Sequence, residues 1–167
     1  WIRLSEHCWL NTFCGKPVCI LRENDKILFS VKNENVSEEV RKSLVDYFRL
    51  EDDLAIYYEE WNRDAHFKKL ASAFPAIRCL RQDPVETLFA FICSQNNAIP
   101  RITKMVQHLK SKYGERVGEY SGQPLYTFPI LTKLAAEGVE GELRLAGFGY
   151  RAKYIQGAAR HLIDSGL

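Results

Sequence analysis

The sequence contains no apolar run long enough to cross a bilayer, since a membrane-spanning helix requires about 20 consecutive apolar residues. It has no internal repeat and no low-complexity segment. It also shows no signal peptide, and it begins at Trp1 instead of methionine. These absences predict a globular chain without a membrane span, and the start at tryptophan predicts a fragment of a longer protein.

Recognisable cofactor and metal motifs are also absent. The five cysteines include no Cys-x-x-Cys pair, and the four histidines have no metal-ligand spacing. This odd set of cysteines favours reduced, mostly buried thiols in an intracellular compartment over a disulfide framework. There is no phosphate-binding P-loop and no defensible Ser/His/Asp arrangement. We therefore expect no metal and no cofactor.

Charge is nearly balanced over the whole chain but not along it. With 46% hydrophobic residues, the chain can form a core, and its net charge is only +2. Residues 32–64 contain ten acidic and five basic side chains, whereas residues 95–167 contain ten basic and six acidic ones. The basic second part favours an anionic partner, although a solvated helix face would have the same composition.

The first thirty residues have the pattern of β structure. Apolar or alternating runs over 17–24 and 25–33 are joined at Asn24-Asp25, which suits a hairpin turn. From Ser37, a predicted N-cap, the apolar spacing becomes helical, and further helices are expected over 52–61 and 66–74.

A clear helix start follows at Asp83, with Pro84 at the first helical position and Glu86 at the third, as in a capping box. The apolar residues behind it cover nearly the whole helix circumference, so we expect this helix, which ends near residue 94, to be central and buried. They are Leu88, Phe89, Phe91, Ile92 and Cys93.

The helix after it combines an apolar stripe with a basic one. The apolar stripe comprises Ile99, Ile102, Met105, Val106, Leu109 and Tyr113, and the basic stripe Arg101, Lys104, His108 and Lys112. The basic stripe could face phosphates or be an ordinary wet surface.

Glycines and a proline over 114–124 predict a loop, and two short helices are expected near 129–138 and 140–147. The last helix is expected over 150–164, with an inward face of Ala152, Ile155, Ala159, Leu162 and Ile163.

Two corners between helices carry the most distinctive residues. In GFGYRA (147–152), Ala152 occupies the third glycine position of a dinucleotide fingerprint and no parallel strand precedes, so that fingerprint is excluded. Gly147 would instead end a helix, which leaves Tyr150 and Arg151 exposed at a loop tip.

In SQNNAIPR (94–101), the asparagines either cap helices or present fixed hydrogen-bond donors and acceptors.

Together, LRQDPVETLFAFICSQNNAIPRITKMVQHL and LAGFGYRAKYIQGAAR resemble the eukaryotic 8-oxoguanine DNA glycosylase family. Nearly all of the family signatures Q-D-P, F-I-C-S-x-N-N-x-I-x-R-I and L-G-x-G-Y-R-A-x-Y are present, in order and at the right spacing. The resemblance extends back through FRLEDDLAIYYEEW and covers essentially the whole chain. Ala98 replaces a third asparagine often found in the family, and Gln95 replaces a serine.

The resemblance implies base-excision repair, in which 8-oxoguanine opposite cytosine is removed and the strand is cleaved at the abasic site. By similarity, Tyr150 is the wedge beside the unpaired cytosine. Asn96, Arg101 and Arg151 match the residues that read that cytosine, and Asn97 matches a neighbouring family asparagine. The family's nucleophilic lysine and assisting aspartate would follow Leu167, so the chain itself is expected to be inactive and to contain no catalytic residue. The glycine that reads the oxidised base would precede Trp1.

The implied fold is α+β, a mostly helical glycosylase core preceded by the remnant of an antiparallel, TBP-like sheet. Residues 1–82 would form the N-terminal domain, with β structure to about residue 32, and residues 83–167 the first part of a helix-hairpin-helix core that lacks the hairpin. The expected partner is double-stranded DNA with 8-oxoguanine paired to cytosine, bound by a monomer in the nucleus or the mitochondrion. A non-catalytic helical adaptor that binds DNA or protein is the alternative.

Overall fold

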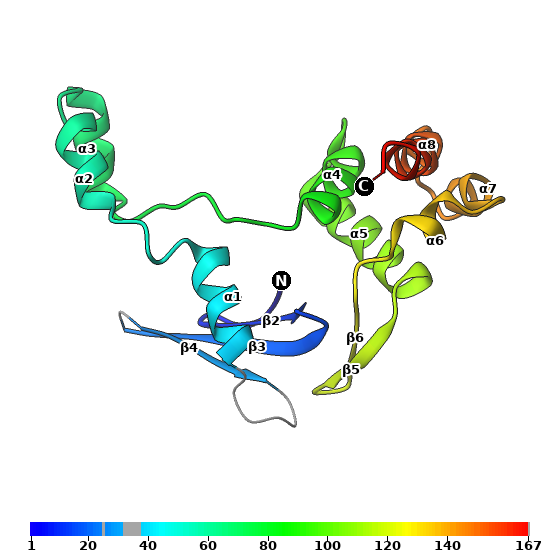
Figure 1. Ribbon diagram of the computed structural model, residues 1–167, viewed down its shortest axis with the longest axis horizontal. Coiled ribbons are helices and arrows are strands. Elements are labelled where there is room, and N and C mark those ends of the chain that lie inside the picture. Colours follow the sequence, from blue (N-terminus) through cyan, green and yellow to red (C-terminus); the bar gives the residue numbers. More distant parts are fainter. Residues whose placement is uncertain (25, 32–37, 167) are drawn as a thin grey trace. The chain divides into compact units, whose positions relative to one another are not determined.

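The computed structural model describes residues 1–24, 26–31 and 38–166. It divides into two compact units, one formed by residues 1–35 and 83–167 and the other by residues 36–82. Each unit is considered by itself. The first contains all the strands and five of the helices shown in Figure 1, and the second contains helices α1 to α3.

The first unit begins with a four-stranded antiparallel sheet in the order β1-β2-β3-β4. Its strands are β1 (Ile2–Ser5), β2 (Cys8–Phe13), β3 (Lys16–Glu23) and β4 (Lys26–Val31). Glu23 pairs with Lys26, so the predicted hairpin is confirmed, and Asn24 has the left-handed φ of 52° that such turns require. Its turn partner Asp25 lies outside the described residues.

Five helices and a second hairpin follow in the same unit. They are α4 (Pro84–Ser94), α5 (Ile99–Tyr113), α6 (Leu131–Ala135), α7 (Val139–Leu145) and α8 (Arg151–Asp164), with the hairpin β5 (Arg116–Tyr120) and β6 (Gln123–Tyr126) between α5 and α6. The hairpin corrects the predicted loop over 114–124. Ser121 and Gly122, at φ of 49° and 77°, form its two-residue turn.

One hydrophobic core joins these helices. Asp83 caps α4 as predicted, with its carboxylate accepting from the Glu86 N–H at 2.7 Å. However, the expectation that α4 is buried all round is wrong, because Leu88 and Phe91 are 39% and 68% exposed. The buried core residues are Phe89, Ile92, Cys93, Met105, Leu109, Tyr113, Leu134, Val139, Leu143, Phe148, Ala152, Ile155 and Ala159.

The outer positions of the predicted apolar stripes are also exposed. Ile99 of α5 is 78% exposed and Ile163 of α8 is 38% exposed. Conversely, Lys110 of α5 is buried, where its Nζ lies 3.3 Å from Glu86 and 3.4 Å from the Asn11 side-chain oxygen on β2. A buried ammonium is tolerated when such acceptors surround it.

The second unit contains α1 (Glu38–Phe48), α2 (Leu54–Trp61) and α3 (Ala65–Ala73). The predicted Ser37 cap of α1 lies outside the described residues. Asp53 and Asp64 cap α2 and α3 through their carboxylates. Ring contacts among Tyr57, Tyr58, Trp61 and Phe67 join these two helices, with ring-centroid distances of 5.3 to 6.4 Å.

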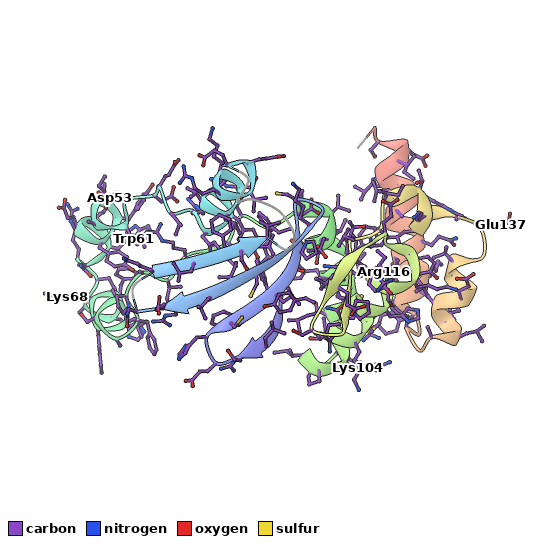
Figure 2. The ribbon with its side chains drawn as sticks, turned by 90° about the horizontal axis from the view of Figure 1, so that it is seen from below. Asp53, Trp61, Lys68, Lys104, Arg116 and Glu137 are labelled. Carbon is purple, nitrogen blue, oxygen red and sulfur yellow. The ribbon has the colours of Figure 1, made fainter. Side chains whose placement is uncertain are left out.

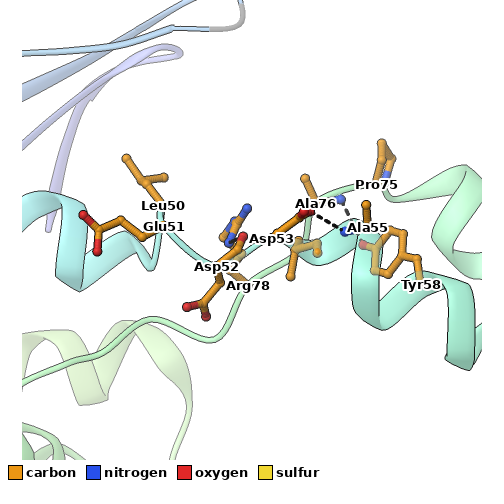
Figure 3. Close-up of a pocket in the computed structure, with 10 residues that line it drawn as sticks. Leu50, Glu51, Asp52, Asp53, Ala55, Tyr58, Pro75, Ala76 and Arg78 are labelled. Carbon is orange, nitrogen blue, oxygen red and sulfur yellow. Dashed lines mark hydrogen bonds between the residues drawn. The ribbon is translucent and has the colours of Figure 1, made fainter.

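A pocket of about 560 Å³ lies within the second unit. Figure 3 shows its lining between the end of α1 and the start of α2. Arg78, which follows α3, lines the pocket and donates from Nη1 to the carbonyls of Arg49 and Asp52 at 2.5 and 2.9 Å, which ties the segment after α3 to the connection between α1 and α2. None of the residues that the sequence predicts as site residues lines this pocket.

Candidate nucleic-acid interface

The corner between α4 and α5 is held by Asn97. Its Nδ2 donates to the Cys93 carbonyl at 2.9 Å and lies 3.2 Å from the Met105 sulfur, while its Oδ1 accepts from the Ala98 N–H at 3.0 Å. The Asn97 side chain therefore bonds the last turn of α4, whose C-cap is Gln95. Ala98 occupies the N-cap of α5 without a side-chain bond, so the expectation that an asparagine caps that helix is wrong. Asn96 has a left-handed φ of 47° and is exposed.

The turn between α7 and α8 is a Schellman motif. The Gly147 N–H donates to Arg144 at 3.1 Å, and the Phe148 N–H donates to Leu143 at 3.0 Å. Phe148 and Leu143 both lie in the core, at 1% and 0% exposure. Gly147 thus ends the helix as the sequence predicts, and Gly149 continues the turn at a φ of 61°.

Replacing Gly147 by alanine is expected to destabilise the protein by about 1–2 kcal/mol, because a φ of 83° places an L side chain in the left-handed region. An added Cβ would meet no atom within 4 Å, so the cost is conformational and not steric. Urea unfolding of the variant measures it.

Gly157 provides the matched control. It lies in the interior of α8, is exposed, and also has open space where a Cβ would be added. Gly157→Ala should stabilise the protein by about 0.5–1 kcal/mol. A loss of stability in the control, or no loss at Gly147, would contradict the prediction.

Arg151, at the start of α8, is buried and not exposed at a loop tip as the sequence suggested. Its Nε donates to the Gln95 carbonyl at 3.0 Å, its Nη2 to the Asn96 carbonyl at 3.0 Å, and its Nη1 to the Phe148 carbonyl at 3.5 Å. The Nη2 atom also contacts the Gln95 carbonyl. The Gln95 and Asn96 carbonyls follow the carboxyl end of α4, where the helix dipole favours a cation. Together with the Phe148 carbonyl they make the burial of the guanidinium tolerable.

Tyr150 precedes Arg151 and is 46% exposed. Its hydroxyl donates to the same Gln95 carbonyl at 3.2 Å, and the Arg151 guanidinium carbon lies 4.7 Å from its ring centroid. Tyr154, one turn on, meets the ring edge to face at 6.4 Å. The ring is therefore fixed by a hydrogen bond and a cation–π contact, while nearly half of its surface is accessible.

Arg101 makes the reciprocal connection. Its Nη2 donates from the first turn of α5 to the Gly147 carbonyl at 2.9 Å. The Arg151 bonds run the opposite way, from the start of α8 to the carbonyls of Gln95 and Asn96. The two arginines thus connect the corner between α4 and α5 (the 95–98 corner) with the turn between α7 and α8 (the 147–151 turn). The structure thus brings together Asn96, Asn97, Arg101, Tyr150 and Arg151, the residues selected from the sequence.

The predicted basic stripe on α5 is only partly a surface. Lys104 is exposed (Figure 2), and Lys112 is exposed with its Nζ 3.8 Å from Glu142. His108 is half-buried, and its ring centroid lies 5.6 Å from that of Phe148, against the turn that precedes Tyr150. The stripe therefore offers exposed cations at its ends and a packing residue in its middle.

Backbone carbonyls are the part of this site that sequence reasoning missed. Gln95 contributes its carbonyl to both Tyr150 and Arg151, although its side chain was noted only as a replacement. Cys93, two residues before Gln95, is buried, and burial raises the pKa of its thiol to about 11 against the opposing effect of Arg151. Cys93 is thus a packing residue and not a reactive thiol.

Among the described residues no group of three or more His, Cys, Asp or Glu side chains is placed to hold a metal ion. Within the same described ranges, no helix has the length and apolarity to span a membrane.

The cysteines are all free, but only Cys19 and Cys93 are buried, whereas Cys14 and Cys79 are exposed. The expectation of mostly buried thiols is therefore wrong.

The helical region around the two corners defines the class of protein. Residues 89–165 match the family model of the HhH-GPD superfamily of base excision DNA repair proteins. Residues 1–88, which include the four-stranded sheet, match the model of the 8-oxoguanine DNA glycosylase N-terminal domain. The chain belongs to the 8-oxoguanine DNA glycosylase family, and the family and α+β fold predicted from the sequence are confirmed.

Similar proteins agree with this membership. The chain is 39% identical over 153 residues to the N-glycosylase/DNA lyase of Saccharomyces cerevisiae, covering 88% of the chain and 40% of that protein. It is 39% identical over 140 residues to the N-glycosylase/DNA lyase OGG1 of Arabidopsis thaliana, covering 83% of the chain and 38% of that protein. The chain thus spans about 40% of the length of these relatives.

Solved structures show the same fold. The Clostridium acetobutylicum 8-oxoguanine glycosylase/lyase, in complex with double-stranded DNA containing cytosine opposite 8-oxoguanine, has a TM-score of 0.84 and 32% identity. The match covers 100% of this chain and 56% of that one. The DNA-free form of the Clostridium protein has a TM-score of 0.86 and covers 57% of its chain.

Proposed function

We propose that the chain is the part of a base-excision repair enzyme that recognises the cytosine opposite 8-oxoguanine in double-stranded DNA, and that the whole enzyme removes the oxidised base and cleaves the strand at the abasic site by β-elimination. Family membership supports the class of reaction. The observation that carries the proposal within this chain is the set of bonds by which Arg101 and Arg151 connect the 95–98 corner with the 147–151 turn, with a fixed and half-exposed tyrosine beside them.

Tyr150 is proposed as the wedge. A glycosylase that takes a base out of the stack leaves a gap and an unpaired partner base, and an inserted ring keeps the gap from closing. The ring of Tyr150 suits this role because its hydroxyl is held by Gln95 and one face is supported by Arg151. A ring fixed before DNA arrives loses little conformational freedom on insertion.

Asn96, Arg101 and Arg151 are proposed to read the unpaired cytosine. The pairing edge of cytosine has one donor, N4, and two acceptors, N3 and O2. The exposed Asn96 amide can accept from N4, and guanidinium donors can satisfy N3 and O2. Asn97 is proposed to line the same region, where its bond to Cys93 fixes the corner that carries Asn96.

This chain is proposed to supply the wedge and the partner-base contacts but not the nucleophile. Of the lysines in its second part, Lys110 is buried against Glu86, and Lys112 and Lys133 lie within 4 Å of Glu142 and Glu115. A nucleophilic lysine must instead reach the sugar as a free amine. Residues 1–82 and 83–167 are proposed to act as an N-terminal domain and the first part of the glycosylase core.

Borohydride trapping tests the absence of a nucleophile. We expect no covalent adduct between the 167-residue chain and a duplex with 8-oxoguanine opposite cytosine, since Lys110 is buried and the amines of Lys110, Lys112 and Lys133 lie beside carboxylates. The N-glycosylase/DNA lyase of Saccharomyces cerevisiae serves as the positive control. A trapped adduct with this chain would overturn the assignment.

DNA binding tests the proposed function itself. Fluorescence anisotropy should show tighter binding to a duplex with 8-oxoguanine opposite cytosine than to the same duplex with guanine there, and weaker binding when Tyr150 is replaced by alanine. Lys153→Ala is the matched control, because Lys153 is an exposed neighbour on α8 without a proposed role. Equal affinity for the two duplexes, or no effect of Tyr150→Ala, would contradict the proposal.

The protein is proposed to act as a monomer in the nucleus or the mitochondrion.

A further inference from the structure

Two thiols lie side by side in the sheet, away from the candidate interface. Cys8 belongs to β2 and Cys19 to the adjacent antiparallel strand β3. Cys8 pairs with Leu21, and Leu10 pairs with Cys19, so the cysteines are diagonal neighbours on the same face of the sheet. Their sulfur atoms are 3.1 Å apart.

The surroundings of the pair differ for its two members. Cys19 is buried in a small cluster with Leu10 of β2 and Leu125 of β6, whereas Cys8 is half-buried at the margin of that cluster. Tyr120, on β5, packs against the same cluster as Cys19. The hairpin of β5 and β6 thus packs onto the same face of the sheet that carries the thiols.

We propose that Cys8 and Cys19 form an oxidation-sensitive dithiol that hydrogen peroxide converts into a reversible disulfide within the chain. A disulfide bond has an S–S length of about 2.0 Å, so the sulfur atoms need to approach each other by only about 1 Å. The reaction consumes one peroxide, oxidises two thiols by two electrons and releases two water molecules. A thiol reductant reverses it.

The different burial of the two thiols sets the order of the steps. Burial, together with the hydrogen bond to Cys8, raises the pKa of Cys19 to about 11, so its thiol stays protonated at neutral pH. The more accessible Cys8 attacks peroxide as the thiolate, the O–O bond breaks, and Cys8 becomes a sulfenic acid with hydroxide as the leaving group. The Cys19 sulfur then bonds to the Cys8 sulfur, the S–O bond breaks, and water leaves with the Cys19 proton.

Peptide mapping under non-reducing conditions tests the proposal on the unmodified protein. After peroxide treatment we expect a cross-linked peptide pair that contains Cys8 and Cys19, an intact mass lower by two hydrogen atoms, and loss of both changes on addition of dithiothreitol. Because this measurement needs no variant, it does not depend on how a substitution folds. Absence of the cross-linked pair while Cys14 or Cys79 is oxidised would overturn the proposal.

Variants test the order of the steps. Cys19→Ser should leave Cys8 as a sulfenic acid that dimedone labels, and Cys8→Ser should label Cys19 several-fold less. Cys14→Ser is the matched control, since Cys14 is exposed at the turn between the same two strands and its replacement should leave the cross-link unchanged. Equal labelling of Cys8 and Cys19, or loss of the cross-link in Cys14→Ser, would contradict the assigned roles.

Discussion

Phe148→Ala is expected to lower the free energy of unfolding by about 3–5 kcal/mol, among the largest effects of any single truncation in this chain. The ring is 1% exposed, and it packs in the core formed by α4 to α8. It is also the second residue of the Schellman turn, whose N–H bonds to Leu143. The substitution therefore opens a cavity at the point where the turn is attached to the core.

Chemical denaturation measures this loss, with the slope compared between variants to confirm that both unfold in the same way. Leu145→Ala is the matched control, because Leu145 lies at the end of the preceding helix and is 92% exposed. Its replacement should change stability by no more than about 0.5 kcal/mol. Similar losses in the two variants would show that Phe148 does not anchor the turn.

The same substitution links stability to DNA binding. Tyr150 is two residues from Phe148 and is held in place by the turn that Phe148 anchors. Where the folded form of Phe148→Ala persists, its affinity for the lesion duplex should therefore fall although no residue proposed to touch DNA has changed. Unchanged affinity would mean that the Gln95 and Arg151 contacts alone fix the ring.

Helix positions and boundaries could largely be predicted from the sequence, because they depend on local signals. Asp83 followed by Pro84 marks the start of α4, and the glycine at 147 marks the end of α7. The β5–β6 hairpin could not be recognised in the same way. Its glycines and Pro124 have the composition of a loop, and only pairing across the turn makes these short segments strands.

Burial was predicted less well than secondary structure, since it depends on contacts between distant segments. Spacing alone assigned Phe91 and Ile99 to apolar faces, but both are mostly exposed. Lys110 and Arg151 are buried for the opposite reason, because acceptors from other segments surround their cationic groups. The acceptors of Arg151 are backbone carbonyls, which no side-chain pattern reveals.

The candidate residues themselves were identified by resemblance, and the structure adds how they are joined. Spacing could suggest two exposed corners, but it could not show that Arg101 bonds to the second corner and Arg151 to the first. This reciprocal arrangement means that each arginine has a structural task as well as its proposed contact with cytosine. Substitutions must therefore be designed to separate the two roles.

Arg151→Met is expected to reduce the preference for cytosine opposite the lesion by roughly 5- to 150-fold, which corresponds to about 1–3 kcal/mol for a lost guanidinium contact to a base edge. The informative quantity is the ratio of affinities for two duplexes that differ only in carrying cytosine or adenine opposite 8-oxoguanine. A purely structural defect weakens both affinities alike, because the Gln95 and Asn96 carbonyls lose their donor in either case. A lost reading contact changes the ratio instead.

Two further variants complete the experiment. Arg151→Lys keeps the charge but cannot present the guanidinium fork, so the cytosine preference should stay low even though some affinity for DNA returns. Tyr150→Phe removes the hydroxyl bond to Gln95 while keeping the ring, and it should weaken binding without changing the ratio. An unchanged ratio in both Arg151 variants would assign Arg151 solely to holding the corner against the turn, and the reading of cytosine would then rest on Asn96 and Arg101.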